Sequence, residues 1–344
     1  MKVIALTGGG TGGHVYPLLS VYNYLKEDKE LKFIWVGEQD SLEEEEALKN
    51  RIPFEDISAG KIRRYFDIRN LYEPLKNVSG VTQGIQLIKK YKIDIIFSKG
   101  GYVSLPLCIA GKILGKKIYI HESDTVTGAT NNIVGGLATK IFYTFPNKNI
   151  NGKKHILTGQ ILNPELIDYL DDLDVTENEK LSVMIIAGSQ GSTRIFDSML
   201  KILPNLQDIN FHIILGEKNL HFRERFKEFK NIVAHDFITQ KRLGKIYKNV
   251  DIAITRAGAT TLWELNTFGI HSIIIPLKES ANNHQFENAI YFKNKFGSDL
   301  ISDENNMEIE IFKLLQKYKD LRKVGLNIDK FFDPLKIIKD EITK

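Results

Sequence analysis

Short runs of β-branched and aromatic residues alternate with helix-length segments along the chain. Such alternation is typical of βαβ units, in which helices cross over between the parallel strands of one sheet. The series of strand-like runs restarts after residue 150, so the pattern predicts an α/β fold with two Rossmann-like, doubly wound parallel sheets. We expect strands at Lys2–Leu6, Lys32–Val36, Asp94–Phe97, Lys117–Ile120 and Lys140–Phe145, then at Leu181–Ala187, Phe211–Leu215, Ile232–Phe237, Asp251–Thr255 and Ser272–Pro276. We expect helices at Pro17–Lys26, Ser41–Asn50, Thr82–Tyr91, Arg194–Leu203 and Thr260–Phe268, among others.

The length of 344 residues agrees with two domains of ordinary size. We place the first domain at 1–157 and the second at 158–329, with the possibility that a C-terminal helix at about 330–344 packs back on the first. In doubly wound sheets, ligands bind at the carboxyl ends of the strands, where the strand order reverses. We therefore expect the two domains to face a common ligand cleft, and the residues that follow each strand are the candidate site.

Cysteine content and hydropathy limit the compartment. Cys108 is the only cysteine, which excludes an internal disulfide or a multi-cysteine zinc site and is typical of a reducing environment. The apolar run at the start is ended by glycine too early for a signal peptide, and no run approaches the roughly 18 apolar residues of a spanning helix. We therefore expect a cytoplasmic protein.

The charged residues are segregated along the chain. Lysine and arginine exceed aspartate and glutamate only by 47 to 43, which argues against a nucleic-acid partner. Residues 1–59 hold six basic and eleven acidic side chains, whereas residues 60–92 hold eight basic and two acidic ones among many apolar residues. This mixture suits contact with an anionic bilayer, but the residues alone favour an amphipathic surface helix with solvated lysines. The candidate docking residues are Arg63, Arg64, Arg69, Leu71, Tyr72 and Leu75.

The first strand runs into the glycine-rich sequence GGGTGGH at residues 8–14. Without Cβ atoms, the backbone N–H groups of such a turn can approach an anion or a sugar closely. His14, at the junction with the next helix, is a candidate acid–base group. The turn also satisfies the G-x-G-x-x-G pattern of dinucleotide sites, with Glu38 as the ribose-binding acid, so a nicotinamide enzyme stays open. A tight turn without a ligand is the third interpretation.

Two further turns follow strands of the second series. The loop AGSQGS at 187–192 offers N–H and hydroxyl donors to a phosphate, unless Ser192 only caps the next helix. In RAGATTLWE at 256–264, the helix N-terminus at Thr260 suits a phosphate, and Glu264, one turn further on, suits a ribose diol. The alternative is that Thr260 caps the helix and Glu264 is an exposed acid. The amide-rich segment NNHQFENA at 282–289 suits sugar hydroxyls.

In this order, the motifs resemble those of the MurG family of peptidoglycan glycosyltransferases, which has the two-domain GT-B fold. The resemblance covers nearly the whole chain and rests on GGTGGH (9–14), SAGK (58–61), GGYVSLP (100–106), HESD (121–124) with Gly128 and Asn131, GSQG (188–191), RAGATTLWE (256–264), and His284-Gln285 with Asn288-Ala289. It implies inverting transfer of N-acetylglucosamine (GlcNAc) from UDP-GlcNAc to the muramyl sugar of a polyprenyl-diphosphate carrier, lipid I, to give lipid II. No Asp-x-Asp ends a strand as a metal clamp would, so we expect neither a metal nor a cofactor.

The resemblance also implies roles for individual residues. Ile238 would hold the uracil through its backbone, Glu264 the ribose, and Ser189 with the amides of 259–261 the diphosphate. His14 would be the catalytic base on the acceptor hydroxyl. The expected donor-binding residues are Thr11, Gly12, Gly13, Asp124, Asn163, Ser189, Ile238, Ala259, Thr260, Thr261, Leu262, Trp263, Glu264, His284 and Gln285.

Two positions depart from the usual family sequence. Asp124 stands where an asparagine is common, so a carboxylate replaces an amide beside the donor sugar, where it or Glu122 would assist the base. Asn163 stands where an arginine usually lies near the diphosphate, which removes a bidentate cation from that place. Arg194 and Arg256 are the candidates to replace that cation.

A lipid-linked acceptor is reached at the cytoplasmic leaflet, so the resemblance favours a peripheral protein on that face of an anionic cell membrane. Other interpretations are a transferase for another lipid acceptor or a UDP-GlcNAc 2-epimerase on the same fold. A nicotinamide oxidoreductase and a non-catalytic nucleotide-sugar binder are the alternatives from other classes. The oxidoreductase leaves the motifs of the second domain without a role.

Overall fold

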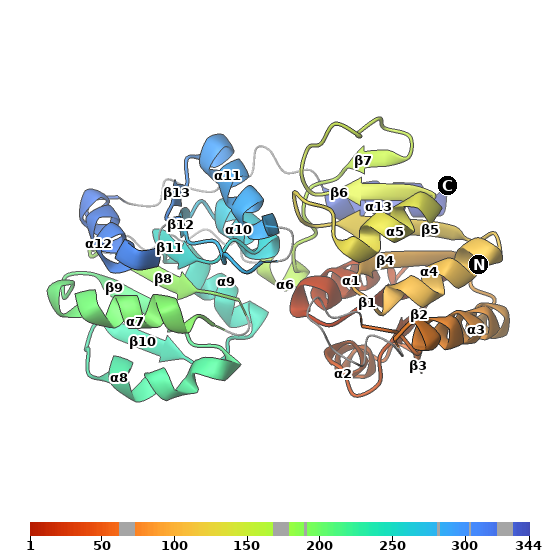
Figure 1. Ribbon diagram of the computed structural model, residues 1–344, viewed down its shortest axis with the longest axis horizontal. Helices are drawn as coiled ribbons and strands as arrows, with labels where there is room; N and C mark the ends of the chain where they lie inside the picture. The colour runs from red at the N-terminus through yellow and green to blue at the C-terminus, as the bar shows by residue number, and fades with distance from the viewer. Residues whose placement is uncertain (62–72, 168–178, 189–190, 281–282, 303, 322–332) are drawn as a thin grey trace. The chain divides into compact units, whose positions relative to one another are not determined.

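The computed structural model describes residues 1–61, 73–167, 179–188, 191–280, 283–302, 304–321 and 333–344. The chain divides into two compact units, each with its own parallel sheet (Figure 1). Unit 1 comprises Met1–Ile161 and Phe332–Lys344, and unit 2 comprises Leu162–Phe331. The chain therefore returns to unit 1 at its end.

Within its described residues, the sheet of unit 1 has the order β3-β2-β1-β4-β5-β6-β7, and all neighbouring strands are parallel. The strands are β1 (Lys2–Gly8), β2 (Leu31–Gly37), β3 (Phe54–Asp56), β4 (Ile95–Gly100), β5 (Lys117–Glu122), β6 (Lys140–Tyr143) and β7 (His155–Leu157). Helices cover both faces because successive strand residues point to opposite sides and both sides are apolar. One face packs against α1 (Gly12–Leu25), α2 (Leu42–Lys49) and α13 (Pro334–Thr343), and the other against α3 (Glu73–Tyr91), α4 (Ser104–Ile113) and α5 (Ala129–Leu137).

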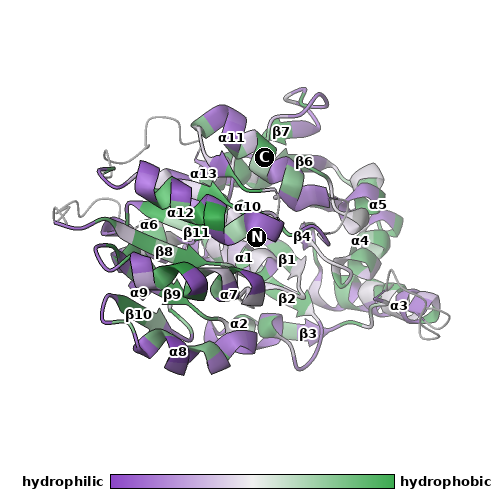
Figure 2. Cartoon of the chain, turned by 60° about the vertical axis from the view of Figure 1, so that its left-hand side comes forward, coloured by the Kyte–Doolittle hydropathy of each residue, from purple (hydrophilic) through white to green (hydrophobic). Residues whose placement is uncertain are grey.

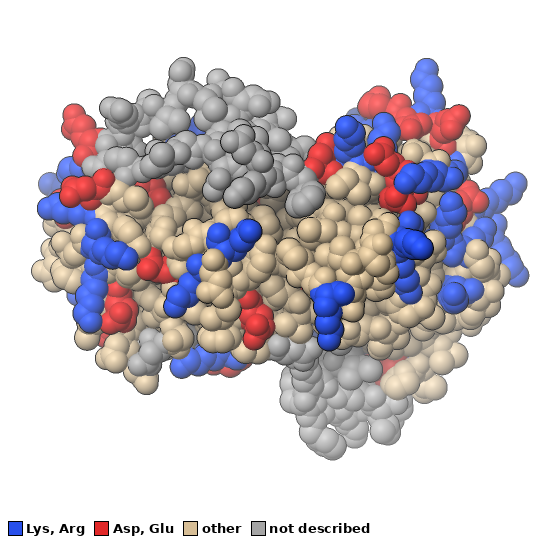
Figure 3. Space-filling model, turned by 90° about the horizontal axis from the view of Figure 1, so that it is seen from above, with Lys and Arg blue, Asp and Glu red and all other residues tan. Residues whose placement is uncertain are grey.

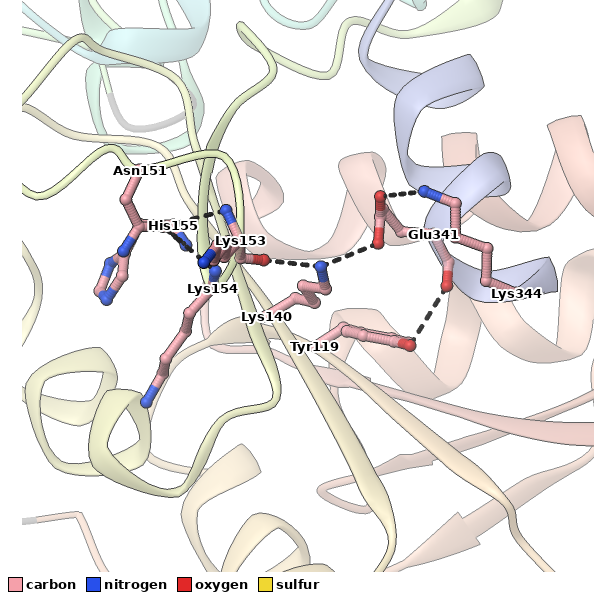
Figure 4. Close-up of polar contacts among 8 residues, drawn as sticks. All are labelled: Tyr119, Lys140, Asn151, Lys153, Lys154, His155, Glu341 and Lys344. Carbon is pink, nitrogen blue, oxygen red and sulfur yellow. Dashed lines mark hydrogen bonds and ion pairs between the residues drawn. The ribbon is translucent and has the colours of Figure 1, made fainter.

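Helix α13 is fixed to unit 1 by polar contacts as well as by its apolar face. The Tyr119 hydroxyl donates to the carbonyl oxygen of Glu341 at 3.2 Å, and the Lys140 ammonium pairs with the Glu341 carboxylate at 3.1 Å (Figure 4). The Lys2 ammonium donates to the carbonyl oxygens of Ile342 and Thr343. The last helix of the chain thus completes the core of unit 1, beside α1.

Within the described part of unit 2, the strand order is β10-β9-β8-β11-β12-β13, again parallel. The strands are β8 (Ser182–Ile186), β9 (Asn210–Ile214), β10 (Ile232–His235), β11 (Ile252–Thr255), β12 (His271–Ile274) and β13 (Asp299–Leu300). Strands β8 to β10 are predominantly hydrophobic (green in Figure 2). The helices are α6 (Pro164–Ile167), α7 (Thr193–Ile202), α8 (Arg223–Lys227), α9 (Gln240–Lys248), α10 (Ala259–Thr267), α11 (His284–Phe296) and α12 (Met307–Lys317), with short 3-10 turns at Leu203–Asn205, Glu217–Phe222 and Glu304–Asn306.

The structure confirms the two doubly wound parallel sheets and all ten strands expected from the sequence. Strands β3, β7 and β13 were not expected, because each has only two or three residues and lies at an end of its sheet. The start of α1 was predicted wrongly. The helix begins at Gly12 rather than at Pro17, since a proline in the second turn removes only one intrahelical hydrogen bond.

In both units the strand order reverses beside the first strand. The reversal lies between β1 and β4 in unit 1 and between β8 and β11 in unit 2. These are the switch points at which doubly wound sheets bind ligands. In each unit, the glycine-containing turns identified from the sequence follow these two strands.

Candidate active site

At the switch point of unit 1, two glycine turns touch each other. Gly101, just after β4, has φ +82°, a conformation that favours glycine. A Cβ atom added there would lie 2.8 Å from the carbonyl oxygen of Gly9 and 3.4 Å from Nδ1 of His14. The turn after β4 therefore packs directly against the turn after β1 and against the candidate base.

His14 is the third residue of α1 and is partly buried. Its Nδ1 lies 2.9 Å from the carbonyl oxygen of Gly9, which can only accept a hydrogen bond, so Nδ1 carries the proton. Burial lowers the pKa of His14, and the charge of Lys99 lowers it further, against the opposing effects of Gly9 and Asp124. The ring is therefore held neutral with the lone pair on Nε2, the form that a general base requires.

The structure distinguishes the two carboxylates considered as partners of the base. Glu122, at the end of β5, is buried and accepts from the amides of Asp124 at 3.1 Å and Gly128 at 3.0 Å, and from the carboxamide of Asn131 at 2.9 Å. It thus organises the loop after β5. Asp124 is the carboxylate whose charge acts on the pKa of His14.

Sequence reasoning missed Lys99 at this switch point. Thr7 pairs with Ser98 and Gly8 with Gly100, so Lys99 is the extra residue of a bulge in β4. Its side chain is 1% exposed, and its ammonium donates to the hydroxyl of Ser123. Burial lowers the pKa of Lys99 to about 8. The available signal was a lysine between a buried strand and two glycines.

In unit 2, α10 starts directly after the loop that follows β11. Gly258 is the N-cap, and Ala259, Thr260 and Thr261 form the first turn, at the positive end of the helix dipole. The Leu262 amide already donates to the Gly258 carbonyl at 3.0 Å. The first turn is thus suited to a diphosphate, whereas Thr260 is not the cap that the alternative interpretation required.

Leu262 and Trp263 are the next two residues of α10 that were expected to contact the donor, and their side chains pack within unit 2. Leu262 is fully buried. The indole ring of Trp263 packs edge-on against Phe292 and Phe296 of α11, with centroid separations of 5.3 and 5.7 Å. The Trp263 side chain therefore fixes α10 against α11.

Arg256 connects the loops at the switch point of unit 2. Its buried guanidinium donates to the Ser192 hydroxyl at 2.9 Å and to the Ile275 carbonyl at 3.1 Å. Ser192 is the N-cap residue of α7, but its hydroxyl makes no capping bond. Arg194, by contrast, pairs at the surface with Glu279 at 2.8 Å. Of the two candidate replacement cations, Arg256 thus links the loop after β11 to the residues that follow β8 and β12, whereas Arg194 lies at the surface.

Glu264 is 7% exposed, so the interpretation as an exposed first-turn acid is wrong. The helix places it on the side that faces α9, where the Tyr247 hydroxyl donates to its carboxylate at 3.2 Å. Burial raises the pKa of Glu264 to about 7, although the bond from Tyr247 opposes the shift. A carboxyl with this pKa is ready to ionise when hydroxyl donors approach it.

The remaining predicted donor contacts lie at loops and helix starts of unit 2. Asn163 accepts the amide of Glu165 at 2.9 Å and so starts α6. Ile238 has a buried side chain, and no hydrogen bond to its backbone occurs among the described residues. His284 begins α11, and Gln285 accepts the amide of Leu277 at 3.0 Å. Ser189 lies outside the described residues, as do Arg63, Arg64, Arg69, Leu71 and Tyr72.

The sequence is similar to known proteins over most of its length. It is 36% identical over 330 residues to the UDP-N-acetylglucosamine–N-acetylmuramyl-(pentapeptide) pyrophosphoryl-undecaprenol N-acetylglucosamine transferase of Clostridium kluyveri, covering 93% of this chain and 91% of that protein. The chain belongs to this transferase family. Residues 4–143 match the glycosyltransferase family 28 N-terminal domain and residues 182–329 its C-terminal domain. The chain is thus a glycosyltransferase, and the alternative of a nicotinamide oxidoreductase is wrong.

Solved structures share the fold. The crystal structure of Acinetobacter baumannii MurG has a TM-score of 0.78 at 23% identity and covers 100% of this chain and 99% of that one. A UDP-GlcNAc 2-epimerase from Neisseria meningitidis bound to UDP-GlcNAc has a TM-score of 0.68 at 16% identity and covers 100% of both chains. The fold is therefore shared by transferases and epimerases, and the family membership rests on the sequence.

Proposed function

We propose that this glycosyltransferase moves GlcNAc from UDP-GlcNAc to lipid I with inversion at the anomeric carbon. The observation that carries the proposal is the neutral, oriented imidazole of His14 at the switch point of unit 1, in a chain of this transferase family. A hydroxyl of the muramyl sugar gives its proton to Nε2 of His14 as its oxygen attacks C1 of GlcNAc. The bond from C1 to the UDP oxygen breaks in the same displacement.

The leaving UDP carries the negative charge that forms in this step. The first-turn amides at Ala259, Thr260 and Thr261 are the proposed donors to its diphosphate, together with Ser189. The backbone of Ile238 would read the uracil, and Glu264 would accept the ribose hydroxyls. The sugar would lie against His284 and Gln285. Thr11, Gly12, Gly13, Asp124 and Asn163 complete the proposed donor contacts.

We further propose that unit 1 docks on an anionic membrane at the cytoplasmic face of the cell membrane, where a lipid-linked acceptor is available. Leu75 and Val78 lie one turn apart on α3 and are each 66% exposed, and Lys76, Lys89 and Lys90 are exposed on the same helix. Apolar side chains beside lysines suit the headgroup boundary. The segment with Arg63, Arg64 and Arg69 leads directly into α3. No helix among the described residues is long and apolar enough to cross a membrane.

One face of the molecule shows no continuous basic surface among its described residues (Figure 3). On the face seen in Figure 3, basic side chains (blue) and acidic ones (red) are interspersed. A polyanion such as nucleic acid is bound through a continuous basic surface. We therefore restrict the proposed membrane contact to the region of α3.

The donor and the acceptor are tested together by measuring UDP release from a panel of nucleotide sugars, with and without a lipid I analogue. The proposal requires release from UDP-GlcNAc that depends on the acceptor. Acceptor-independent conversion of UDP-GlcNAc to a free sugar and UDP would support the epimerase instead.

A further inference from the structure

A bulge at the switch point places a lysine beneath the glycine turns of unit 1. The bulge arises because β4 has one more residue than β1 between the pairs Thr7–Ser98 and Gly8–Gly100. Bulges re-aim side chains and are frequent next to active sites. A Cβ atom added to Gly8 would lie 3.1 Å from Cβ of Lys99, so the lysine stem runs directly under the turn that leads to His14.

The head of Lys99 lies among the polar groups that follow β5. Its ammonium donates to the Ser123 hydroxyl. Burial lowers the pKa of Lys99, and the charges of Glu122 and Asp124 oppose this shift. His121, on the same strand as Glu122, is a further titratable group near Lys99, and its Nε2 donates to the carbonyl oxygen of Gly159 at 3.1 Å. From α5, the facing side chain is the neutral Asn131, which is bonded to Glu122.

Lys99 is 1% exposed, so its ammonium does not contact a substrate and affects the reaction only through its electrostatic effect on neighbouring side chains. We propose that Lys99 is a positioning residue for the base: its buried ammonium, held by Ser123 beside two carboxylates, keeps His14 in the neutral, proton-accepting form. This inference rests on the proposed role of His14 in transfer. Without the ammonium, the charge of Asp124 would act on His14 unopposed by Lys99 and would favour the protonated imidazolium.

Burial lowers the pKa values of His14 and His121, and the charge of Lys99 lowers both further. Since the pKa of Lys99 itself is about 8, its charge is present over the pH range in which a histidine titrates. Above about pH 8 the Lys99 ammonium loses its proton, so a variant without this charge should then have the same activity as the natural protein.

The direct test is an NMR titration of the His14 imidazole, whose resonance is assigned by its absence from the His14→Ala variant. We expect a higher titration midpoint in Lys99→Met than in the natural protein and an almost unchanged midpoint in Lys99→Arg. The acid limb of kcat/KM should shift to higher pH with the titration midpoint, and kcat/KM of Lys99→Met and of the natural protein should be equal above about pH 9. Lys32→Met, at the opposite end of the same sheet, is the matched control.

An unchanged midpoint in Lys99→Met would overturn the inference, and so would an equal shift in Lys99→Arg, because packing would then explain the effect. If Lys99→Met does not fold, Lys99→Gln provides the same comparison. The NMR titration needs no turnover. It therefore separates a failure of this inference from a failure of the proposed lipid I reaction.

Discussion

The Nδ1 atom of His14 lies 2.9 Å from the carbonyl oxygen of Gly9, and this contact decides which ring nitrogen can accept a proton. Gly9 belongs to the turn that the sequence identified for its glycines, and its carbonyl oxygen orients the imidazole of His14, the proposed base. The glycine-rich turn therefore has a role besides close approach to a ligand.

Replacing the proposed base should remove proton transfer and leave the fold of unit 2 intact. We expect His14→Ala to lower kcat by about 10²–10⁴-fold with little change in the Kd for UDP. His221→Ala, an exposed histidine of unit 2, is the control and should keep full activity. Steady-state kinetics and calorimetric UDP binding measure both quantities. An equal loss of UDP binding would make His14 a donor ligand instead.

Gly101 tests the contact between the two glycine turns. Gly101→Ala places a methyl group against the Gly9 carbonyl and the His14 ring, so we expect a loss of kcat in addition to a loss of stability. Gly115→Ala is a matched control because Gly115 also has positive φ (+66°) and no atom within 4 Å of the added Cβ. It should lose about 1 kcal/mol of stability and little activity. Equal activities of the two variants would show that the close packing is dispensable.

Glu264 makes UDP binding depend on pH. The proposed ribose hydroxyls favour the carboxylate, so UDP affinity should weaken as the pH falls below about 7, approaching tenfold per pH unit. Glu264→Gln should bind UDP more weakly at neutral pH and should lose the part of the pH dependence that the carboxylate contributes, whereas the part from the terminal phosphate of UDP remains. Glu310→Gln, a half-buried acid of α12, is the control. Calorimetry between about pH 5.5 and 8.5 measures the effect, and equal profiles of the natural protein and Glu264→Gln would contradict the assignment.

The Glu264 carboxyl also makes the free energy of unfolding depend on pH, but here the effect is a decrease as the pH rises. Its pKa is raised on folding, so the folded state binds the proton more tightly, and this contribution is fully present below about pH 4.5. It is lost as the pH rises through about 7. Glu264→Gln should lack this decline in the free energy of unfolding.

Membrane docking is tested with vesicles of anionic lipid. Leu75→Glu with Val78→Glu should reduce sedimentation with vesicles, because both side chains are exposed on α3 and acquire a charge that the bilayer repels. Charge reversal at Arg63, Arg64 and Arg69 should have the same effect. Val233→Glu, 49% exposed on β10 of unit 2, is the control. Unchanged binding of both variants would exclude this region as the docking surface.

The sequence predicted the parts of the structure that depend on local pattern. The buried strands are continuous apolar runs, and turns such as 8–14 and 256–264 contain glycines at strand ends, so both could be recognised from composition. Lys99 was missed because its position depends on a bulge. Arg256 was named only as a candidate cation, because its bond to Ser192 joins loops that are distant in sequence. Glu264 was placed correctly on its helix, but its burial depends on Tyr247, which only the tertiary fold brings near.

The most direct test of the account follows the sugar itself. The protein is incubated with UDP-GlcNAc labelled in the sugar and with a lipid I analogue, and the label is traced in the lipid and aqueous fractions. The account predicts that the label enters a disaccharide lipid, that this needs the acceptor, and that His14→Ala nearly abolishes it. Label recovered only as a free sugar, or equal transfer by His14→Ala, would contradict it.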